Sequence, residues 1–278
     1  MKIYKQGDTA YIVDDDRMYR TSCDWDQLIN RTALYHRLRE DCAGFELISD
    51  LDLSGPFDPP VLRQELWASG VTYLRSRQAR VAESKSSGGG DFYDRVYDAD
   101  RPELFFKAAA HRIVGHTGTV HIRRDSSWNV PEPELTLFIC SQGSIEGYTI
   151  GNDMSSRSIE GENPLYLPQA KTYDRSAALG PCLYVPEQPL SMRSAVSLKI
   201  EREGAVVFNE TITLDRMKRQ PRELADWLFR ALSFPQGCYL MTGTGIVPPD
   251  DFTLQVGDTV SITIEGIGTL INTVNQSK

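Results

Sequence analysis

The chain has 278 residues, of which 40% are hydrophobic and 24% are charged, and its formal net charge is −8. This composition is ordinary for a soluble globular protein, and the length suffices for one large domain or two. The acidic balance argues against a nucleic-acid or anionic-membrane surface, although a bound cation could still attract a small anionic substrate.

The first sixty residues predict a short hairpin followed by a helix. Residues 10–13 read as a strand that ends in a turn-prone run of aspartates. A helix is expected next, with Thr21 or Ser22 as its N-cap and Leu38 on its apolar face. The Pro- and Gly-rich residues 54–60 then mark a break, where we expect an N-terminal subdomain to end.

From residue 65 onward the chain predicts mostly short strands. Residues 66–68 and 70–73 indicate the first of them, and the Ser- and Gly-rich residues 84–90 indicate a surface loop or a lid. Residues 221–233 predict a helix, because a proline suits its first turn and an apolar stripe follows. That stripe is formed by Leu224, Trp227, Leu228, Ala231 and Leu232.

Together these elements predict an α+β fold, mostly β, in two parts. We expect a small N-terminal α/β subdomain over residues 1–62 and a β-rich domain over residues 63–278. No apolar run reaches the roughly 18–20 residues that span a membrane, and residues 1–8 lack the apolar segment of a signal peptide. The five cysteines form no Cys-x-x-Cys pair, so we expect reduced, mostly buried thiols in a cytoplasmic protein.

Residues 131–135, Pro-Glu-Pro-Glu-Leu, place two carboxylates one residue apart. In an extended chain such residues point to the same side, so Glu132 and Glu134 would aim at one point. Like charges this close repel unless a cation or a shared proton lies between them. Asp153, after a strand-like segment, offers a third carboxylate, and an all-oxygen set suits Mg²⁺, Mn²⁺ or Ca²⁺ rather than zinc. The ordinary alternative for such a pair is the solvated face of a half-exposed sheet.

Further segments follow in a fixed order. They are Gly-Tyr-Thr-x-x-Asn-Asp-x-Ser-x-Arg from residue 147, Lys-x-x-Asp from 171, Leu-Gly-Pro from 179, Thr-Gly-Thr-Gly from 242 and Val-Gly-Asp-Thr-Val from 256. With the Pro-Glu-x-Glu-Leu segment, the chain resembles the fumarylacetoacetate hydrolase family over about residues 65–273. The resemblance implies that family's fold and a metal site on Glu132, Glu134 and Asp153. It says less about the reaction, because members include hydrolases, decarboxylases, isomerases and dehydratases.

The same resemblance implies two further site residues. Lys171 matches the lysine of the family's Lys-x-x-Asp motif, and a nearby cation would lower its pKa. It could act as a base or donate to a substrate carboxylate, and the sequence leaves both roles open. Thr244 resembles the family's contact to the substrate carboxylate, and the glycines on either side of it would let the backbone approach a ligand closely.

The chain departs from the family's hydrolases at one segment. Those enzymes carry Asn-Tyr-x-x-His-x-x-Glu there, and the His–Glu pair activates the attacking water. Tyr73 keeps the tyrosine, but Ser76 and Ala79 stand where the histidine and glutamate would be. A serine without a base cannot activate water, so hydrolysis of a carbon–carbon bond is not expected from this segment.

Other segments, around residues 66–73, 97–107 and 126–134, resemble the family's dehydratase branch, which acts on 2-keto-3-deoxy sugar acids. The resemblance implies removal of water from an acid such as 2-keto-3-deoxy-D-arabinonate to give 2,5-dioxopentanoate. In that branch a glutamate matching Glu103 lies near the metal, and the apolar residues after Glu103 favour a partly buried carboxylate with a raised pKa. Tyr73, Arg75 and Lys107 lie in the matching region and are candidate substrate contacts.

Three other functions stay open at this point. A hydrolase of acylpyruvate-type or fumarylacetoacetate-type compounds would need another residue in place of the missing histidine. An oxaloacetate-decarboxylase-like enzyme would need only the metal and a proton donor. A non-enzymatic protein that binds 2-oxo acids would need no catalytic group. In each case we expect a small-molecule 2-oxo acid as ligand, no nucleic acid, no membrane, and assembly as a homodimer or homotetramer.

Overall fold

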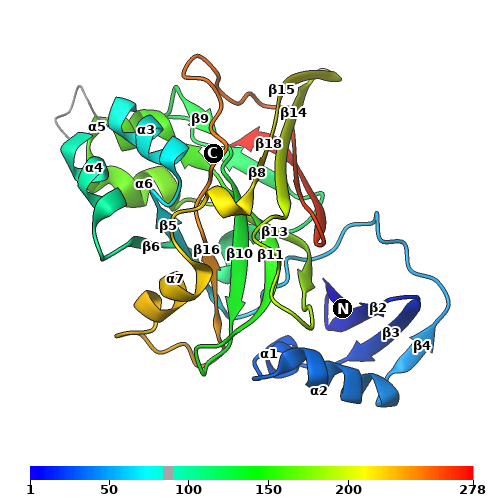
Figure 1. Ribbon diagram of the computed structural model, residues 1–278. Helices are drawn as coiled ribbons and strands as arrows, with labels where there is room; N and C mark the ends of the chain where they lie inside the picture. Colours follow the sequence, from blue (N-terminus) through cyan, green and yellow to red (C-terminus); the bar gives the residue numbers. More distant parts are fainter. Residues whose placement is uncertain (84–89, 278) are drawn as a thin grey trace.

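The computed structural model describes residues 1–83 and 90–277, and strands dominate it (Figure 1). The larger sheet holds, in spatial order, β4 (Glu46–Ile48), β3 (Arg17–Ser22), β2 (Thr9–Asp14), β1 (Lys2–Gln6), β13 (Ala177–Tyr184), β11 (Ile145–Asp153), β10 (Pro133–Ile139), β16 (Cys238–Met241), β5 (Glu65–Gly70) and β6 (Glu103–Ala108), with β7 (Ile113–Val114) beside β13. The smaller sheet has the order β15 (Ala205–Thr213), β14 (Ala195–Arg202), β17 (Thr259–Ile264), β18 (Gly268–Gln276) and β8 (Thr119–Ile122). The mostly β fold predicted from the sequence is confirmed.

The helices are short and lie outside the sheets. They are α1 (Trp25–Ile29), α2 (Leu34–Asp41), α3 (Leu74–Glu83), α4 (Gly90–Asp98), α5 (Arg157–Glu162), α6 (Leu167–Lys171) and α7 (Pro221–Leu228). A short strand pair, β9 (Asn129–Val130) with β12 (Ser155–Ser156), precedes α5. Figure 1 shows α3 to α6 gathered at one end of the molecule, with α1 and α2 at the opposite end. Among the described residues, no helix is long and apolar enough to cross a membrane.

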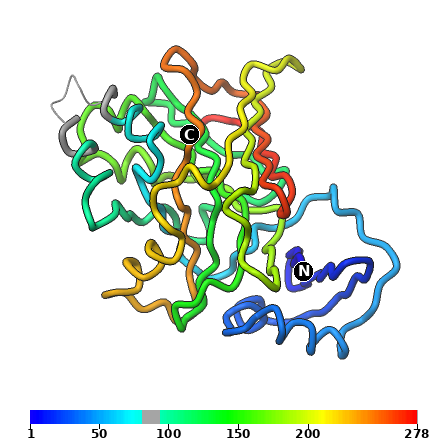
Figure 2. Tube along the Cα trace, in the orientation of Figure 1, coloured from blue at the N-terminus to red at the C-terminus, as the bar shows by residue number. Residues whose placement is uncertain are grey.

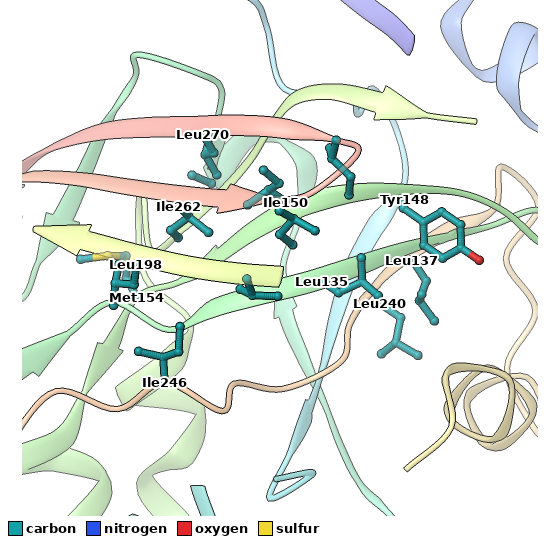
Figure 3. Close-up of a cluster of buried hydrophobic side chains, with 14 of the residues drawn as sticks. Leu135, Leu137, Tyr148, Ile150, Met154, Leu198, Leu240, Ile246, Ile262 and Leu270 are labelled. Carbon is teal, nitrogen blue, oxygen red and sulfur yellow. The ribbon is translucent and has the colours of Figure 1, made fainter. Parts of the chain in front are cut away.

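The main hydrophobic core lies between the two sheets. Residues facing inward from β10 and β11 meet residues facing inward from the smaller sheet, as Figure 3 shows. They include Leu135, Leu137 and Ile150 on one side and Leu198, Ile262 and Leu270 on the other, all of them buried. Because each fully buried aliphatic side chain contributes roughly 1.5–3 kcal/mol, this layer fixes where β10 and β11 lie.

The N-terminal strands continue the larger sheet, because β1 pairs antiparallel with β13. Figure 2 shows the blue N-terminal segment beside the rest of the trace, joined to β5 by a long light-blue connection. That connection contains the predicted break at residues 54–60. The division into 1–62 and 63–278 stays a prediction about folding units. All five cysteines are free and four are buried, as the sequence predicted.

Several local predictions need correction. The N-cap of α1 is Asp24, whose side chain accepts a hydrogen bond from Gln27 N, because Thr21 and Ser22 are already paired in β3. Leu38 lies in the separate helix α2 and is fully buried there. The expected loop or lid at residues 84–90 falls mostly outside the described residues, and Gly90 already belongs to α4.

Two further boundaries differ from the prediction. The first strand of the β-rich domain ends at Gly70, because Val71 adopts a positive φ of 53° that an extended strand cannot contain. Residues 74–83 then form α3, a helix that the sequence patterns did not predict. The late helix ends at Leu228, so Leu232 is 41% exposed and does not join the buried stripe.

Candidate active site

The candidate site begins where β10 and β11 meet at their ends. The two strands pair antiparallel, with Glu134 opposite Gly151. One step further, Glu132 N donates to Asp153 O at 3.2 Å and Asp153 N donates to Glu132 O at 3.0 Å. This register places Glu132, Glu134 and Asp153 on one face, all buried, with one carboxylate oxygen of each within 4.8 Å of the others.

Each carboxylate is oriented by a different group on the protein. Arg157 Nη2 donates to Glu132 Oε1 at 2.7 Å, and Gly243 N donates to Glu134 Oε2 at 2.5 Å. Lys107 Nζ lies 2.6 Å from Asp153 Oδ1. In each carboxylate, one oxygen therefore contacts one of these three groups and the other oxygen does not. Such orienting partners are typical of groups that hold a metal ion.

The electrostatics of the cluster favour a cation. Burial, followed by the charges of Asp153 and Glu132, raises the pKa of Glu134 well above its ordinary value. Burial would also raise the pKa of Asp153, but the ammonium groups of Lys107 and Lys171 hold it below the ordinary range. Three buried carboxylate oxygens form a hard donor set, which suits Mg²⁺, Mn²⁺ or Ca²⁺. The residues present therefore fit a divalent ion, which would relieve the repulsion on Glu134.

Lys171 lies inside the cluster rather than on a loop. It is the last residue of α6 and is fully buried. Its Nζ donates to Asp153 Oδ2 at 3.0 Å and to Glu132 Oε2. Lysine is almost never fully buried without partners. The Lys171 ammonium thus contacts the Asp153 oxygen that Lys107 does not contact and the Glu132 oxygen that Arg157 does not contact.

Glu103 reaches the same region from the neighbouring strand. It is the first residue of β6 and pairs with Gly70 of β5. A Cβ on Gly70 would lie 1.9 Å from Glu103 Oε2, so only glycine leaves room for this carboxylate. Burial raises the pKa of Glu103, although Arg80 and Lys171 oppose the shift. The partly buried carboxylate with a raised pKa that the sequence predicted is confirmed.

A cavity opens onto the three carboxylates and Lys171. It is lined by Ser69, Gly70, Val71, Ser76, Arg80, Phe105, Glu132, Glu134, Asp153, Lys171 and Thr244. Thr244 lies in the cavity wall, and its predicted contact with the substrate carboxylate stays a prediction. Tyr73, Arg75 and Lys107 do not line the cavity. Tyr73 is buried beside Gly245, Arg75 is exposed on α3, and Lys107 lies behind Asp153 and also donates to Met154 O at 3.0 Å. Their expected contact with substrate stays a prediction, which this placement does not support.

The segment that departs from the hydrolases forms the first turns of α3. Ser76 Oγ donates to Tyr73 O at 2.8 Å and accepts from Tyr73 N at 3.2 Å. Its hydroxyl is thus bonded to the backbone at the start of the helix, and Ala79 next to it is buried. No His–Glu pair is present in α3, so this part of the site offers no base to activate water.

Sequence reasoning missed a buried group of charges beside the triad. Arg80 of α3 forms an ion pair with Glu160 of α5, and Ser155 Oγ donates to Glu160 Oε2 at 3.1 Å. Arg157 could have been found, because it is the arginine of the Asn-Asp-x-Ser-x-Arg segment. Arg80 and Glu160 carry no such signal, since they lie eighty positions apart in the chain (160 − 80).

A β-rich fold that buries three carboxylates around a lysine is the arrangement of a metal-dependent enzyme with oxygen ligands. The family described as fumarylacetoacetate (FAA) hydrolase C-terminal matches residues 77–275. The chain therefore belongs to the fumarylacetoacetate hydrolase family.

Similar proteins within this family are dehydratases by name. The chain is 46% identical to a probable 2-keto-3-deoxyxylonate dehydratase of Haloferax volcanii, over 88% of this chain and 84% of that one. It is 43% identical to 2-dehydro-3-deoxy-D-arabinonate dehydratase of Saccharolobus solfataricus, over 83% and 77%. A solved structure of 2-keto-3-deoxy-D-arabinonate dehydratase complexed with magnesium and 2,5-dioxopentanoate matches with a TM-score of 0.86 at 34% identity, covering 100% of this chain and 98% of that one.

Proposed function

We propose that the protein is a Mg²⁺-dependent dehydratase of a 2-keto-3-deoxy sugar acid such as 2-keto-3-deoxy-D-arabinonate, with 2,5-dioxopentanoate as the product. One observation carries the proposal: the carboxylate triad, Lys171 and Glu103 are together, while α3 has no His–Glu pair for water activation. The named activities of the similar dehydratases support it.

Glu132, Glu134 and Asp153 would hold the ion. Held there, a divalent ion would supply Lewis-acid chemistry at the keto oxygen of a 2-oxo acid, which would make the proton on C3 more acidic. Arg157, Gly243 and Lys107 orient the three carboxylates, so their part in the reaction is to fix the geometry.

Elimination requires a base at C3 and an acid at the C4 hydroxyl, each typically worth 10²–10⁴-fold in rate. Lys171 Nζ lies against two of the triad carboxylates and lines the cavity, and we assign it as the group that takes the C3 proton. Glu103 has a raised pKa and is therefore suited to hold a proton, which it gives to the leaving hydroxyl. The C4–O bond breaks, water leaves, and a proton shift converts the unsaturated 2-oxo acid into the 2,5-dioxo product.

Two wider expectations belong to the same proposal. The protein acts in the cytoplasm, which its five free cysteines support. It assembles as a homodimer or homotetramer, a state that size measurement in solution would test. Thr244 at the cavity wall contacts the substrate carboxylate in this proposal, since its neighbour Gly243 already reaches Glu134 through its backbone N–H.

The test is incubation of the Mg²⁺-loaded protein with 2-keto-3-deoxy-D-arabinonate, followed by mass spectrometry. A product that has lost one water with the carbon chain intact is the expected result. Chain cleavage of an acylpyruvate would instead identify a hydrolase, and release of carbon dioxide from oxaloacetate a decarboxylase. Tight 2-oxo acid binding without turnover of any of these compounds would identify a binding protein.

A further inference from the structure

Arg80 lines the cavity and forms an ion pair with Glu160, and the proposed reaction uses neither residue. The side chains of Arg80 and Glu160 are 5% and 1% exposed. Glu160 is held in turn by Ser155 Oγ. A buried ion pair is weak evidence for stability, because desolvation offsets most of the attraction between its members. Stability by itself therefore does not account for this ion pair.

Arg80 approaches the Glu132 oxygen that Lys171 does not contact. Its Nη2 lies 4.0 Å from Glu132 Oε1, whereas Lys171 contacts Glu132 Oε2. Arg157 already holds Glu132 Oε1 at the shorter distance of 2.7 Å. The orientation of Glu132 therefore does not depend on Arg80, although the guanidinium of Arg80 lines the cavity.

A second polar group lines the same cavity. Ser69, on β5, is 2% exposed, and its Oγ has no hydrogen-bond partner within residues 1–83 and 90–277. A buried hydroxyl without a partner is destabilising, so its position in a cavity wall calls for an explanation. The other hydroxyls at the wall are already engaged: Ser76 bonds to the backbone of Tyr73, and Thr244 Oγ1 donates to Ile246 O at 3.1 Å.

The chemistry of the substrate supplies the missing partner. A 2-keto-3-deoxy sugar acid would use its carboxylate and keto oxygens to chelate a metal ion, which leaves the oxygens on C4 and C5 for contacts with the protein. Ser69 lines this cavity together with Gly70, the next residue of β5, and Glu103 packs against Gly70. Arg80 is the first of the two cations whose charge acts on Glu103.

We propose that Ser69 and Arg80 form the subsite for the distal oxygens of the substrate, with Glu160 as the positioning residue that holds Arg80. This inference rests on the proposed function, because it names how that site would distinguish sugar acids from simpler 2-oxo acids. A site built to hydrogen-bond a substrate oxygen rejects the analogue that lacks it.

The test is equilibrium binding of a matched ligand pair to the Mg²⁺-loaded protein by calorimetry. 2,5-Dioxopentanoate and 2-oxopentanoate differ only in the oxygen on C5, and neither needs to be turned over. We expect the wild type to prefer 2,5-dioxopentanoate by about tenfold or more, the value of a hydrogen bond to a charged group. Ser69→Ala should reduce the preference by roughly threefold, and the double variant Arg80→Met/Glu160→Gln should abolish it.

The double variant avoids leaving Glu160 buried and unpaired, which would destabilise the fold. Arg80→Lys, which keeps the charge but loses the fork geometry, gives a second measurement if the double variant does not fold, and it should also weaken the preference. Gln78→Met, at an exposed position of the same helix, is the matched control and should bind both ligands like the wild type.

The outcomes separate this inference from the proposed function. Equal affinity of the wild type for both ligands, or an unchanged preference in Ser69→Ala and the Arg80 variants, would overturn the subsite. If Arg80 had a purely structural role, its replacement would weaken the binding of both ligands equally, and this result would also overturn the subsite. A preserved ligand preference that depends on Ser69 and Arg80, in a protein that does not dehydrate the sugar acid, would support the subsite and reject the dehydratase.

Discussion

Replacing Glu134 by glutamine should stabilise the metal-free protein and abolish its response to Mg²⁺. Glu134 is 2% exposed, and its pKa is raised by burial and by Asp153 and Glu132. A glutamine oxygen can still accept the hydrogen bond from Gly243 N, so the substitution removes charge while retaining shape and this contact. The metal-free protein would then contain one fewer buried like charge, whereas the metal site would lose one of its three anionic ligands.

The size of the effect follows from the geometry. Two unit charges near 4.8 Å apart repel by roughly 3 kcal/mol at an effective dielectric constant of about 20. Lys171 offsets part of this repulsion, and partial protonation of Glu134 removes more. The net gain in unfolding free energy is therefore on the order of 1–2 kcal/mol, or roughly 2–8 °C in melting temperature for a chain of this size.

The wild type should gain more from the metal than the variant gains from the substitution. At a Mg²⁺ concentration about 100 times the dissociation constant, binding adds roughly 2.7 kcal/mol and raises the melting temperature by roughly 5–11 °C. Scanning calorimetry of chelator-treated and Mg²⁺-loaded samples measures both effects. Glu210→Gln, at an exposed position on β15, is the matched control and should melt like the wild type. A metal-free Glu134→Gln protein that melts below the wild type, or that keeps the Mg²⁺ response, would refute the reasoning.

The pH dependence of the melting temperature is an independent test of the same prediction. The pKa of Glu134 is raised above 4.5 in the folded state, so the folded protein binds more protons there than the unfolded chain does. The contribution of Glu134 to the unfolding free energy is therefore fully present below pH 4.5, and it is lost as the pH rises through the folded-state pKa. Metal binding needs the ionised carboxylate, so the Mg²⁺-induced rise in melting temperature should grow as the pH rises from 4.5 through the folded-state pKa of Glu134.

The remaining predictions concern catalysis and stability. Lys171→Ala and Glu103→Gln should each lower turnover by about two orders of magnitude or more with metal binding retained, as steady-state kinetics and calorimetry would show. Ser76→Ala should cost much less, because no base lies beside its hydroxyl; a large loss there, with near-normal rates in the other two, would place the catalytic groups on α3. Asp258→Ala should lower the unfolding free energy by about 3 kcal/mol in denaturant titration, because it removes both hydrogen bonds to Arg202 from a buried carboxylate. Unchanged stability in that variant would mean that solvent replaces the pair.

The sequence determined those features of the site that depend on near neighbours. Glu134 lies in β10 and Glu132 directly precedes that strand, and the two share a face because side chains alternate along any extended chain. The mostly β character follows from many short apolar runs separated by turn residues. Glu103 was predicted to be partly buried because apolar residues follow it directly, and the structure agrees.

Tertiary structure alone decided which distant residues complete the site. The register of β5 and β6 sets Glu103 against Gly70, and the packing of α3 on α5 joins Arg80 to Glu160. Local propensity also failed at residues 71–83, where the positive φ at Val71 ends the strand and α3 begins. Long-range contacts are the reason: hydrogen bonding across strands and burial between elements outweigh local preferences of a kilocalorie per mole or less, and neither can be read from sequence spacing.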